Sequence, residues 1–419
     1  MSDHGVTLTD LPLEGERVEV SKFSKVIKIA GLIGAVTLAI SLAILFLGSG
    51  ELRKSFSYSW LFACYYFFTI ALGGLFWVLL HHVSNSGWGI AVRRVMEHLA
   101  NMLPFSFIFF IPILILTEPR EALYEWMKLL HTNPDDVLLK GKAPYLTMGF
   151  FFFRFAAYAI SLCGMAWLMR HWSLSQDRTG DVKYTFLARR FSAGFVPVFA
   201  VCCTFMAFDL LMGLDYAWFS TMWGVYIFAG SALSSMAMII LTVTFLRSKG
   251  SLNKVVSIEH YHIMGKLMFA FTVFWAYIAF SQFFLYWYAK ITEETKFYIL
   301  RNTEGWHYVS LLLVFGHFVI PFVFLLRQQA KKDMRQICAA CCWVLFVHLI
   351  DIYWIIIPER GPSITGGDKL MISYGILIDA LAFIAVGSCM IWIFLRSIGK
   401  YSIYPSRDPR LLESTRLVN

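Results

Sequence analysis

Charged residues are scarce in this 419-residue sequence: Asp, Glu, Lys and Arg make up 15% of it, against 58% hydrophobic residues. A soluble protein of this length needs more charge on its surface, so the composition excludes a soluble enzyme, a nucleic-acid-binding protein and a secreted disulfide scaffold. The hydrophobic residues instead form ten runs, each long enough to cross a bilayer as a helix. Runs of this length also exclude an outer-membrane barrel, whose strands alternate over about ten residues.

The sequence therefore predicts an all-α, polytopic membrane protein with ten transmembrane helices. The predicted spans are 26–48, 57–82, 98–116, 144–170, 190–212, 218–246, 262–290, 306–327, 336–357 and 371–396.

Sequence motifs for cofactors are also lacking. There is no glycine-rich phosphate loop, no dinucleotide fingerprint and no Cys-x-x-Cys-His for a c-type haem. All eight cysteines fall inside predicted spans, where thiols pack as small apolar side chains. The CAACC cluster at 338–342 lacks the second cysteine pair of a zinc or iron–sulfur site. The sequence thus predicts no metal site and no cofactor bound by this chain itself, apart from a possible quinol or quinone.

The net charge of +9 follows from topology rather than from a polyanionic partner. The N-terminal segment, every second loop after it and the C-terminal tail hold 24 of the 36 Lys and Arg residues, and the opposite loops hold 11. By the positive-inside rule both termini are cytoplasmic, which is consistent with an even number of helices. Residues 1–25 lack the charged start and small-residue cleavage site of a signal peptide, so we expect the first helix to be retained.

Away from the helix ends, six ionisable residues lie deep inside the predicted spans, and such residues are functional candidates because they are costly to bury in lipid. They are Asp209, Asp351, Asp379, Arg154, His317 and His348. His348 and Asp351 are three residues apart and share a helix face, so the carboxylate could orient the imidazole. Two interpretations stay open: a proton-conducting or ligand-binding cavity, or structural pairing, such as Arg154 with one aspartate.

A second polar group crowds the predicted cytoplasmic ends of the second, third and seventh helices, where it could take up protons or simply contact water and headgroups. It comprises His81, His82, Glu97, His98, Glu259, His260, His262 and Lys266. A haem between His317 and His348 is disfavoured, because no helix carries two histidines about 14 residues apart.

Several long strings resemble one membrane-protein family. They are SGWGIAVRRVMEHLANMLP (86–104), FDLLMGLDYAWFSTMWGVYIFAGS (208–231), HIMGKLMFAFTVFWAYIAFSQFFLYWYAKITEET (262–295), GHFVIPFVFLL (316–326), HLIDIYW (348–354) and PSRDPRLLES (405–414). In this order they resemble the integral membrane subunits of alternative complex III, which belong to the polysulfide-reductase/NrfD-like family. The resemblance covers most of the chain.

The resemblance implies two four-helix bundles flanked by one helix at each end. The implied boundaries are a cytoplasmic N-terminal segment (1–25), the first helix with its loop (26–56), the two bundles (57–212 and 213–357), a loop with the tenth helix (358–396) and a cytoplasmic tail (397–419). It also implies a respiratory or photosynthetic quinol:electron-acceptor oxidoreductase complex in the bacterial inner membrane. The implied partners are a sister NrfD-like quinol-binding subunit, extrinsic iron–sulfur and c-haem subunits, small transmembrane subunits and lipids.

Within that family the resemblance implies a proton pathway through motif positions of this sequence. These are Asp209, Asp215, Lys266, Gln282, His317, His348 and Asp351. Arg154 and Asp379 join the candidates through burial alone, and Glu97 and Glu259 as residues for proton uptake. Two other hypotheses remain: the chain itself binds quinol through His348 and Asp351, or it is an inert scaffold.

Overall fold

The computed structural model describes residues 11, 12, 14–48, 50–303, 305–361 and 374–417. It contains ten helical segments long and apolar enough to cross a membrane, and no strand within those residues. The predicted all-α, ten-span fold is therefore confirmed, and the chain is a multi-pass membrane protein. The predicted start of the tenth span at 371–373, and residues 1–10 and 418–419 of the predicted terminal segments, lie outside the described residues.

Nine of the spans can be named by their main helices. They are α1 (Ser24–Leu47), α2 (Gly50–Val83), α3 with α4 (Ile90–Ala100 and Leu103–Ile115), α8 (Met148–Thr179), α9 (Lys183–Leu210), α10 (Trp223–Ser248), α11 (Ile258–Ala289), α16 (Met334–Ile356) and α18 (Tyr374–Ile398). The eighth span is built from three pieces: α13 (Trp306–Leu312), the π-helix η4 (Leu313–Val319) and α14 (Ile320–Leu326).

Several helices extend further than their apolar runs. The helix α2 begins seven residues before the predicted position 57, and α8 continues nine residues past 170. Polar residues still form helical backbone hydrogen bonds once outside the apolar layer, so hydrophobicity alone underestimates the length. The helix α8 ends where Gly180 adopts a left-handed conformation with φ of 73°, which glycine tolerates without a steric penalty.

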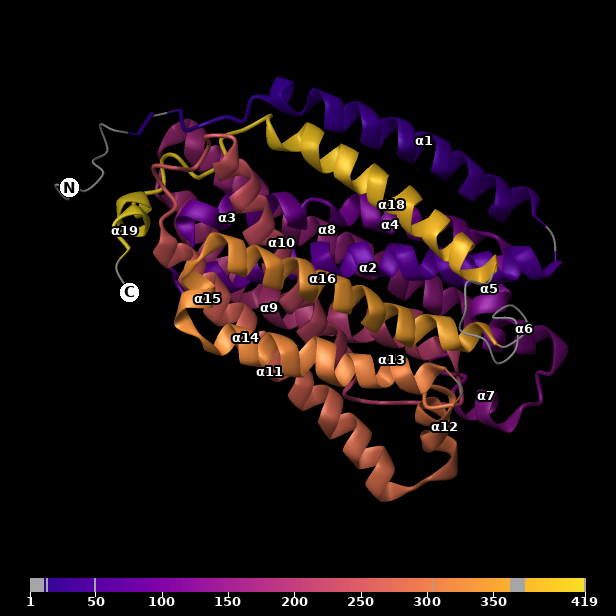
Figure 1. The fold of residues 1–419 in the computed structure, drawn as a ribbon. Coiled ribbons are helices and arrows are strands. Elements are labelled where there is room, and N and C mark those ends of the chain that lie inside the picture. Colours follow the sequence, from indigo (N-terminus) through magenta and orange to yellow (C-terminus); the bar gives the residue numbers. More distant parts are fainter. Residues whose placement is uncertain (1–10, 13, 49, 304, 362–373, 418–419) are drawn as a thin grey trace.

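The helices α2 and α10 form the centre of the molecule. In their most apolar windows 83% and 78% of residues are buried, more than in any other described span. Around them, α2 contacts α3, α4 and α9, and α10 contacts α9, α11 and α16. The first and last spans, α1 and α18, run side by side along one edge of the bundle, as Figure 1 shows, and α18 also packs on α2.

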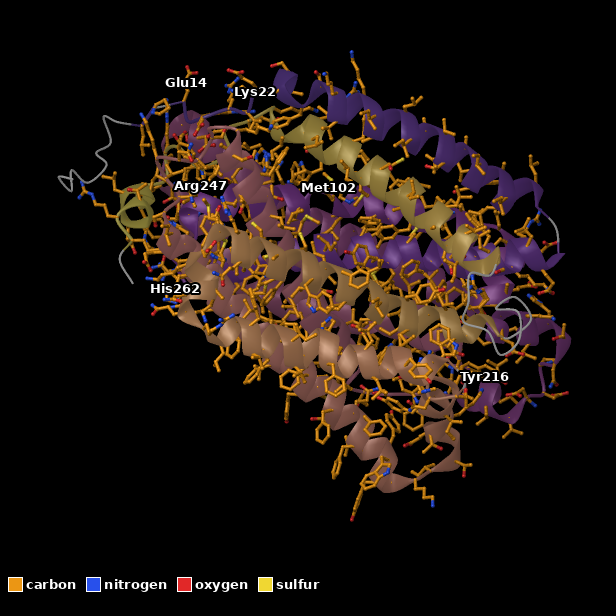
Figure 2. All side chains as sticks on the ribbon, viewed as in Figure 1. Glu14, Lys22, Met102, Tyr216, Arg247 and His262 are labelled. Carbon is orange, nitrogen blue, oxygen red and sulfur yellow. The ribbon has the colours of Figure 1, made fainter. Side chains whose placement is uncertain are left out.

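Both chain ends lie at one end of the bundle (Figure 1). Figure 2 shows Glu14, Lys22, Arg247 and His262 there, and Tyr216 at the opposite end. We call the end with the chain termini the terminus end, and the opposite end, with Tyr216, the far end. The far end carries the short helices α5 (Thr117–Leu123), α6 (Glu125–Thr132), α7 (Val137–Gly141) and α12 (Thr292–Leu300).

The C-terminal tail folds back over the terminus end. Asp408 pairs with Arg93 of α3 at 2.8 Å, and the Ser406 amide donates to Asp177 of α8 at 3.1 Å. The short helix α19 (Leu411–Thr415) follows, and Ser414 donates from its hydroxyl to the Trp88 carbonyl at 2.7 Å. The tail thus ties the first, middle and last parts of the chain together outside the spans.

Candidate functional site: a buried histidine and aspartate cluster

The three intramembrane aspartates lie in three separate buried clusters. The Asp209 cluster is made by Arg154, Asp209, Tyr145 and Tyr158. The Asp379 cluster is made by Arg360, Asp379, Ser59 and Tyr353. The His317 cluster is made by His317, His348, Asp351, Tyr226, Trp275 and Thr69. The clusters differ in how many of their buried nitrogen and oxygen atoms have hydrogen-bond partners. We use this difference to distinguish structural ion pairs from a candidate functional site.

The Asp209 cluster is a closed ion pair. Arg154 donates from Nε and Nη2 to the two carboxylate oxygens of Asp209, both at 2.8 Å. The hydroxyls of Tyr145 and Tyr158 donate to the same oxygens at 2.9 and 2.8 Å, and Arg154 Nη1 reaches the Tyr145 carbonyl at 2.8 Å. Each guanidinium nitrogen and each carboxylate oxygen has a hydrogen-bond partner. Of the two interpretations left open by the sequence, structural pairing of Arg154 with one aspartate therefore describes this cluster.

The Asp379 carboxylate is enclosed in a similar way, although Arg360 Nε has no hydrogen-bond partner among the described residues. Arg360 donates to the two Asp379 oxygens at 2.8 and 3.2 Å, the Ser59 hydroxyl donates at 2.5 Å and the Tyr353 hydroxyl donates at 2.8 Å. Sequence reasoning missed Arg360 as the partner, because this residue lies just beyond the predicted span 336–357. The structure places it at the end of that span, on the 3-10 helix η5 (Ile357–Arg360), where it folds back towards α18.

The His317 cluster brings residues from several helices together in the core. His317 comes from η4, and His348 and Asp351 lie one turn apart on α16. Trp275 of α11 donates its indole N–H to Asp351 at 3.2 Å, and Tyr226 of α10 donates its hydroxyl to the other oxygen. Ligand atoms of the two histidines and Asp351 lie within 4.8 Å of one another, and all three residues are buried.

Hydrogen bonding at Thr69 fixes the tautomer of His348. The single hydroxyl proton of Thr69 is donated to the Tyr66 carbonyl at 2.7 Å. The 2.9 Å contact between Thr69 Oγ1 and His348 Nε2 therefore has Nε2–H as its donor, so a neutral His348 carries its lone pair on Nδ1. That atom has no hydrogen-bond partner among the described residues, and it lies 4.0 Å from Asp351 Oδ2.

His317 is even less satisfied. Within the described part of the chain neither ring nitrogen has a hydrogen-bond partner, and the ring packs against Trp275 with the ring centres 3.8 Å apart. A buried imidazole without partners is costly, so its retention calls for an explanation beyond packing. The side chain faces His348, whose ring centre lies 6.3 Å away.

Proline accounts for the unusual backbone at His317. In an α-helix the His317 carbonyl would accept a hydrogen bond from residue 321, but Pro321 has no N–H. The seven-residue π-helix shifts the bonding by one residue and so avoids that loss. The Gly316 carbonyl, whose π-helical donor would be Pro321, accepts instead from the Trp343 indole at 2.8 Å. Such π segments occur frequently at functional sites.

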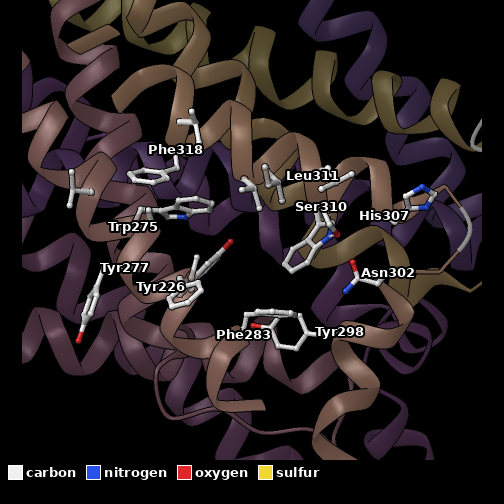
Figure 3. Close-up of a pocket in the computed structure, with 18 of the residues that line it drawn as sticks. Tyr226, Trp275, Tyr277, Phe283, Tyr298, Asn302, His307, Ser310, Leu311 and Phe318 are labelled. Atoms are coloured by element: carbon white, nitrogen blue, oxygen red, sulfur yellow. Dashed lines mark hydrogen bonds between the residues drawn. The ribbon is translucent and has the colours of Figure 1, made fainter. Parts of the chain in front are cut away.

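An open cavity of about 810 Å³ lies beside the cluster, between α10, α11 and the eighth span. Figure 3 shows Tyr226 and Trp275 on one side of it and Asn302 and His307 on another. Aromatic and aliphatic side chains make up most of the wall. Because Tyr226 and Trp275 both donate to Asp351, the cavity is separated from the carboxylate by the side chains that hold it.

Towards the terminus end, hydroxyl groups follow the contact between α2 and α10. Gly73 lies one helical turn, about 6 Å, from Thr69 and packs against Ser231 and Ser235. Ser235 accepts from the Trp77 indole at 3.1 Å, and the Trp77 carbonyl accepts from His81 Nδ1 at 2.7 Å.

Gln282 also lies in the core, two turns from Trp275 on α11. It is 2% exposed, and its amide oxygen and nitrogen both lack a partner among the described residues. The structure does not bring Gln282 into the three clusters, although it shares the buried stripe of α11 with Trp275.

Glu97 is enclosed at the terminus end. Its carboxylate is 1% exposed and lies 3.5 to 3.6 Å from the guanidinium groups of Arg93, Arg94 and Arg170. Arg94 pairs in addition with Asp177 at 2.5 Å. Three guanidinium groups surround this one carboxylate, so the geometry supports a structural role for Glu97 in holding α3 and α8 together.

The remaining candidates lie at the bundle surface. Glu259 pairs with Lys332 at 2.6 Å and lies 3.5 Å from His262, while Lys266 is exposed on α11. Asp215 lies at the far end and pairs with Lys296 at 2.9 Å, and this hydrogen bond raises the pKa of Lys296. The hydrogen bonds of Glu259 and Asp215 thus lead away from the three intramembrane clusters.

Sequence reasoning identified His317, His348 and Asp351 but missed the side chains that complete their environment. Thr69, Tyr226 and Trp275 come from other spans, and nothing in a single apolar run distinguishes them from packing residues. The Gly- and Ser-rich stretch at 228–238 gave a partial signal, since it indicated a close helix contact with small hydroxyl residues. No protein-family model and no curated protein matches this chain.

Proposed function

We propose that this chain is an integral membrane subunit of a quinol:electron-acceptor oxidoreductase of the alternative complex III type, similar to the subunit ActF of the NrfD-like family. Support comes from the ordered family-like strings and from the ten spans. In this proposal the chain lies in the bacterial cytoplasmic membrane with both termini inside. It scaffolds the sister quinol-binding subunit and the extrinsic iron–sulfur and c-haem subunits, and it transfers protons.

The observation that carries the proton-transfer part is the unsatisfied His317 cluster. A group that transfers protons must alternate between donating and accepting, so it cannot be locked into permanent hydrogen bonds. His317 and His348 Nδ1 have no fixed partners in the described part of the chain, and Asp351 lies beside them. The Asp209 and Asp379 clusters lack this property, since each aspartate is held by an arginine and two hydroxyl donors.

The proposed route begins at the terminus end and follows the contact between α2 and α10. His81 keeps Nε2 without a partner among the described residues, and Ser235 and Ser231 lie on the way to Thr69. From Thr69 the route reaches His348, then Asp351 or His317. Tyr226, which donates to Asp351 and lines the cavity, gives the proton an outlet.

The test uses the assembled complex reconstituted in vesicles. We expect Asp351→Asn and His317→Ala to lower the number of protons translocated per electron, because each removes one alternating donor and acceptor. The measurement is the pH change outside the vesicles during a counted pulse of quinol oxidation. Unchanged proton stoichiometry in both variants would disprove the relay.

Asp215→Asn is the matched control. It removes a carboxylate of the same type, but one that pairs with Lys296 at the far end. The proposal requires this variant to keep the wild-type proton stoichiometry. Impaired assembly of the Asp351 and His317 variants, with normal stoichiometry in the complex that forms, would instead support an inert scaffold.

A second candidate function is supported by the cavity. Its volume of about 810 Å³ and its aromatic wall suit a quinone ring with part of an isoprenoid tail. In this alternative the chain itself binds quinol. A quinol hydroxyl contacts Tyr226, which connects it to Asp351 and His348. Photolabelling with an azido-quinone distinguishes the two functions: label on α11 or the eighth span supports binding here, and label confined to the sister subunit excludes it.

A further inference from the structure

The lone pairs of the His317 cluster converge without a positive charge between them. With Nε2–H donated to Thr69, the Nδ1 lone pair of a neutral His348 faces Asp351 Oδ2 at 4.0 Å. His317 adds a third donor, unpartnered within the described residues, that lies within 4.8 Å of the other two. Three electron-pair donors that approach one another in a buried site repel, unless a proton or a metal ion lies among them.

The chemistry of the three donors matches a transition metal. Two imidazole nitrogens and one carboxylate oxygen form a common ligand set for Zn²⁺, with a fourth position left for water. Tetrahedral coordination at about 2.0–2.2 Å places donors roughly 3.4 Å apart, so a closure of about 1.4 Å from the observed limit completes the site. Hard cations such as Ca²⁺ and Mg²⁺ prefer oxygen donors alone and fit less well.

The surrounding side chains supply an outer shell of the kind metal sites use. Metal-binding histidines usually donate the other ring N–H to a fixed acceptor, and here Thr69 accepts from His348 Nε2. The carboxylate is oriented by two donors, Tyr226 and Trp275. These contacts leave one oxygen of Asp351 directed towards the histidines, since Oδ2 accepts only the longer 3.2 Å bond from Trp275.

A path for the ion is available through the cavity. Tyr226 and Trp275 line it, and they are in direct contact with the Asp351 carboxylate. His307 and Asn302 add polar groups to the cavity wall on the side towards the far end (Figure 3). The side chains of Tyr226 and Trp275 therefore lie between the cavity and the Asp351 carboxylate.

We propose that His317, His348 and Asp351 form a binding site for a divalent transition metal of the Zn²⁺ type. The proposal concerns equilibrium binding and does not depend on proton transfer or quinol oxidation. If both occur, metal and proton compete for the same lone pairs.

The experiment titrates Zn²⁺ into the full chain, purified in mild detergent with the subunits that accompany it, after treatment with a chelator. The readout is competition with a chromophoric zinc indicator. We expect one tight equivalent in the wild type, and a loss of at least about tenfold in affinity with His317→Gln, His348→Gln or Asp351→Asn. Thr69→Val removes only the outer-shell acceptor and should weaken binding by about 10–100-fold.

His262→Ala is the control, because His262 lies 3.5 Å from Glu259 at the terminus end, away from the His317 cluster, where the two residues could bind Zn²⁺ adventitiously. The tight equivalent must survive this variant. A wild type without a tight equivalent, binding that persists in all three ligand variants, or binding lost in His262→Ala overturns the proposal.

A second readout does not rely on variants that fold poorly. Co²⁺ in place of Zn²⁺ should give the visible absorption bands of a four- or five-coordinate nitrogen and oxygen site in the wild type. An octahedral, water-like Co²⁺ spectrum at one equivalent would contradict the proposed ligand set.

Discussion

At the scale of single residues, the buried aspartates are of two kinds: those that pair with an arginine and those that do not. Asp209 and Asp379 are buried like Asp351, yet each is paired with an arginine at 2.8 Å. Among the described residues, Asp351 accepts hydrogen bonds only from Tyr226 and Trp275, lies beside His348 and has no arginine or lysine partner. Burial alone therefore does not distinguish a candidate carboxylate from a structural one in this bundle, whereas the lack of an arginine partner does.

Removing the guanidinium of the Asp209 cluster should be strongly destabilising. Arg154→Leu leaves Asp209 as a buried carboxylate without a cation, which costs about 3–5 kcal/mol. The double variant Arg154→Leu with Asp209→Leu removes both charges and should recover most of that loss. Unfolding free energies in detergent for the two variants and the wild type measure the difference.

Lys140→Ala provides the comparison for this ion-pair prediction. Lys140 and Asp135 also form an ion pair at 2.8 Å, but their side chains are 61% and 86% exposed. Solvent screens such a pair, so we expect a change within about 0.5 kcal/mol. If Arg154→Leu had an equally small effect, the buried pair would not have the structural role assigned to it.

At the scale of helices, the contact between α2 and α10 determines the core. A Cβ atom at Gly73 would lie 2.1 Å from the Ser231 carbonyl oxygen, so the two backbones pass as closely as glycine allows. Gly230 on α10 similarly faces His348, since a Cβ atom added to this glycine would lie 3.0 Å from the nearest ring carbon. The central crossing thus positions the Thr69 and His348 side chains relative to each other.

Gly73→Ala should force α2 and α10 apart. We expect a loss of about 1–3 kcal/mol, as found for overpacked cores, together with weaker Zn²⁺ binding because Thr69 moves away from His348. Gly164→Ala on α8 is the matched control, since a Cβ there meets nothing within 4 Å. Thermal unfolding of both variants in the same detergent tests the prediction, and equal melting temperatures would contradict it.

Helix-scale features were only partly predictable. Ten apolar runs sufficed for the number and order of the spans, because a bilayer demands long uncharged segments. Pro104 and Pro321 predict an interrupted helix at two places, and the structure has the break between α3 and α4 at the first and the π-helix at His317 at the second. Proline signals a lost hydrogen bond, but tertiary contacts such as Trp343 to Gly316 decide how the backbone responds.

At the scale of the whole molecule, the candidate site depends on contacts between helices that hydrophobic patterns do not predict. The family-like strings place His317, His348 and Asp351 in order along the chain. They do not reveal that Trp275 and Tyr226 converge on one carboxylate, or that Arg360 returns to Asp379. Periodicity assigns a face to each helix, whereas the partner of that face depends on how ten helices pack together.

The tail over the terminus end has a consequence for biosynthesis. Arg93 lies on α3, but its closest carboxylate, Asp408, follows the tenth span and so leaves the ribosome after all ten helices. Until then the guanidinium groups around Glu97 outnumber the carboxylates near them. A chain that stops before residue 408 keeps this excess of buried positive charge at the terminus end, because Arg93 then lacks its closest carboxylate.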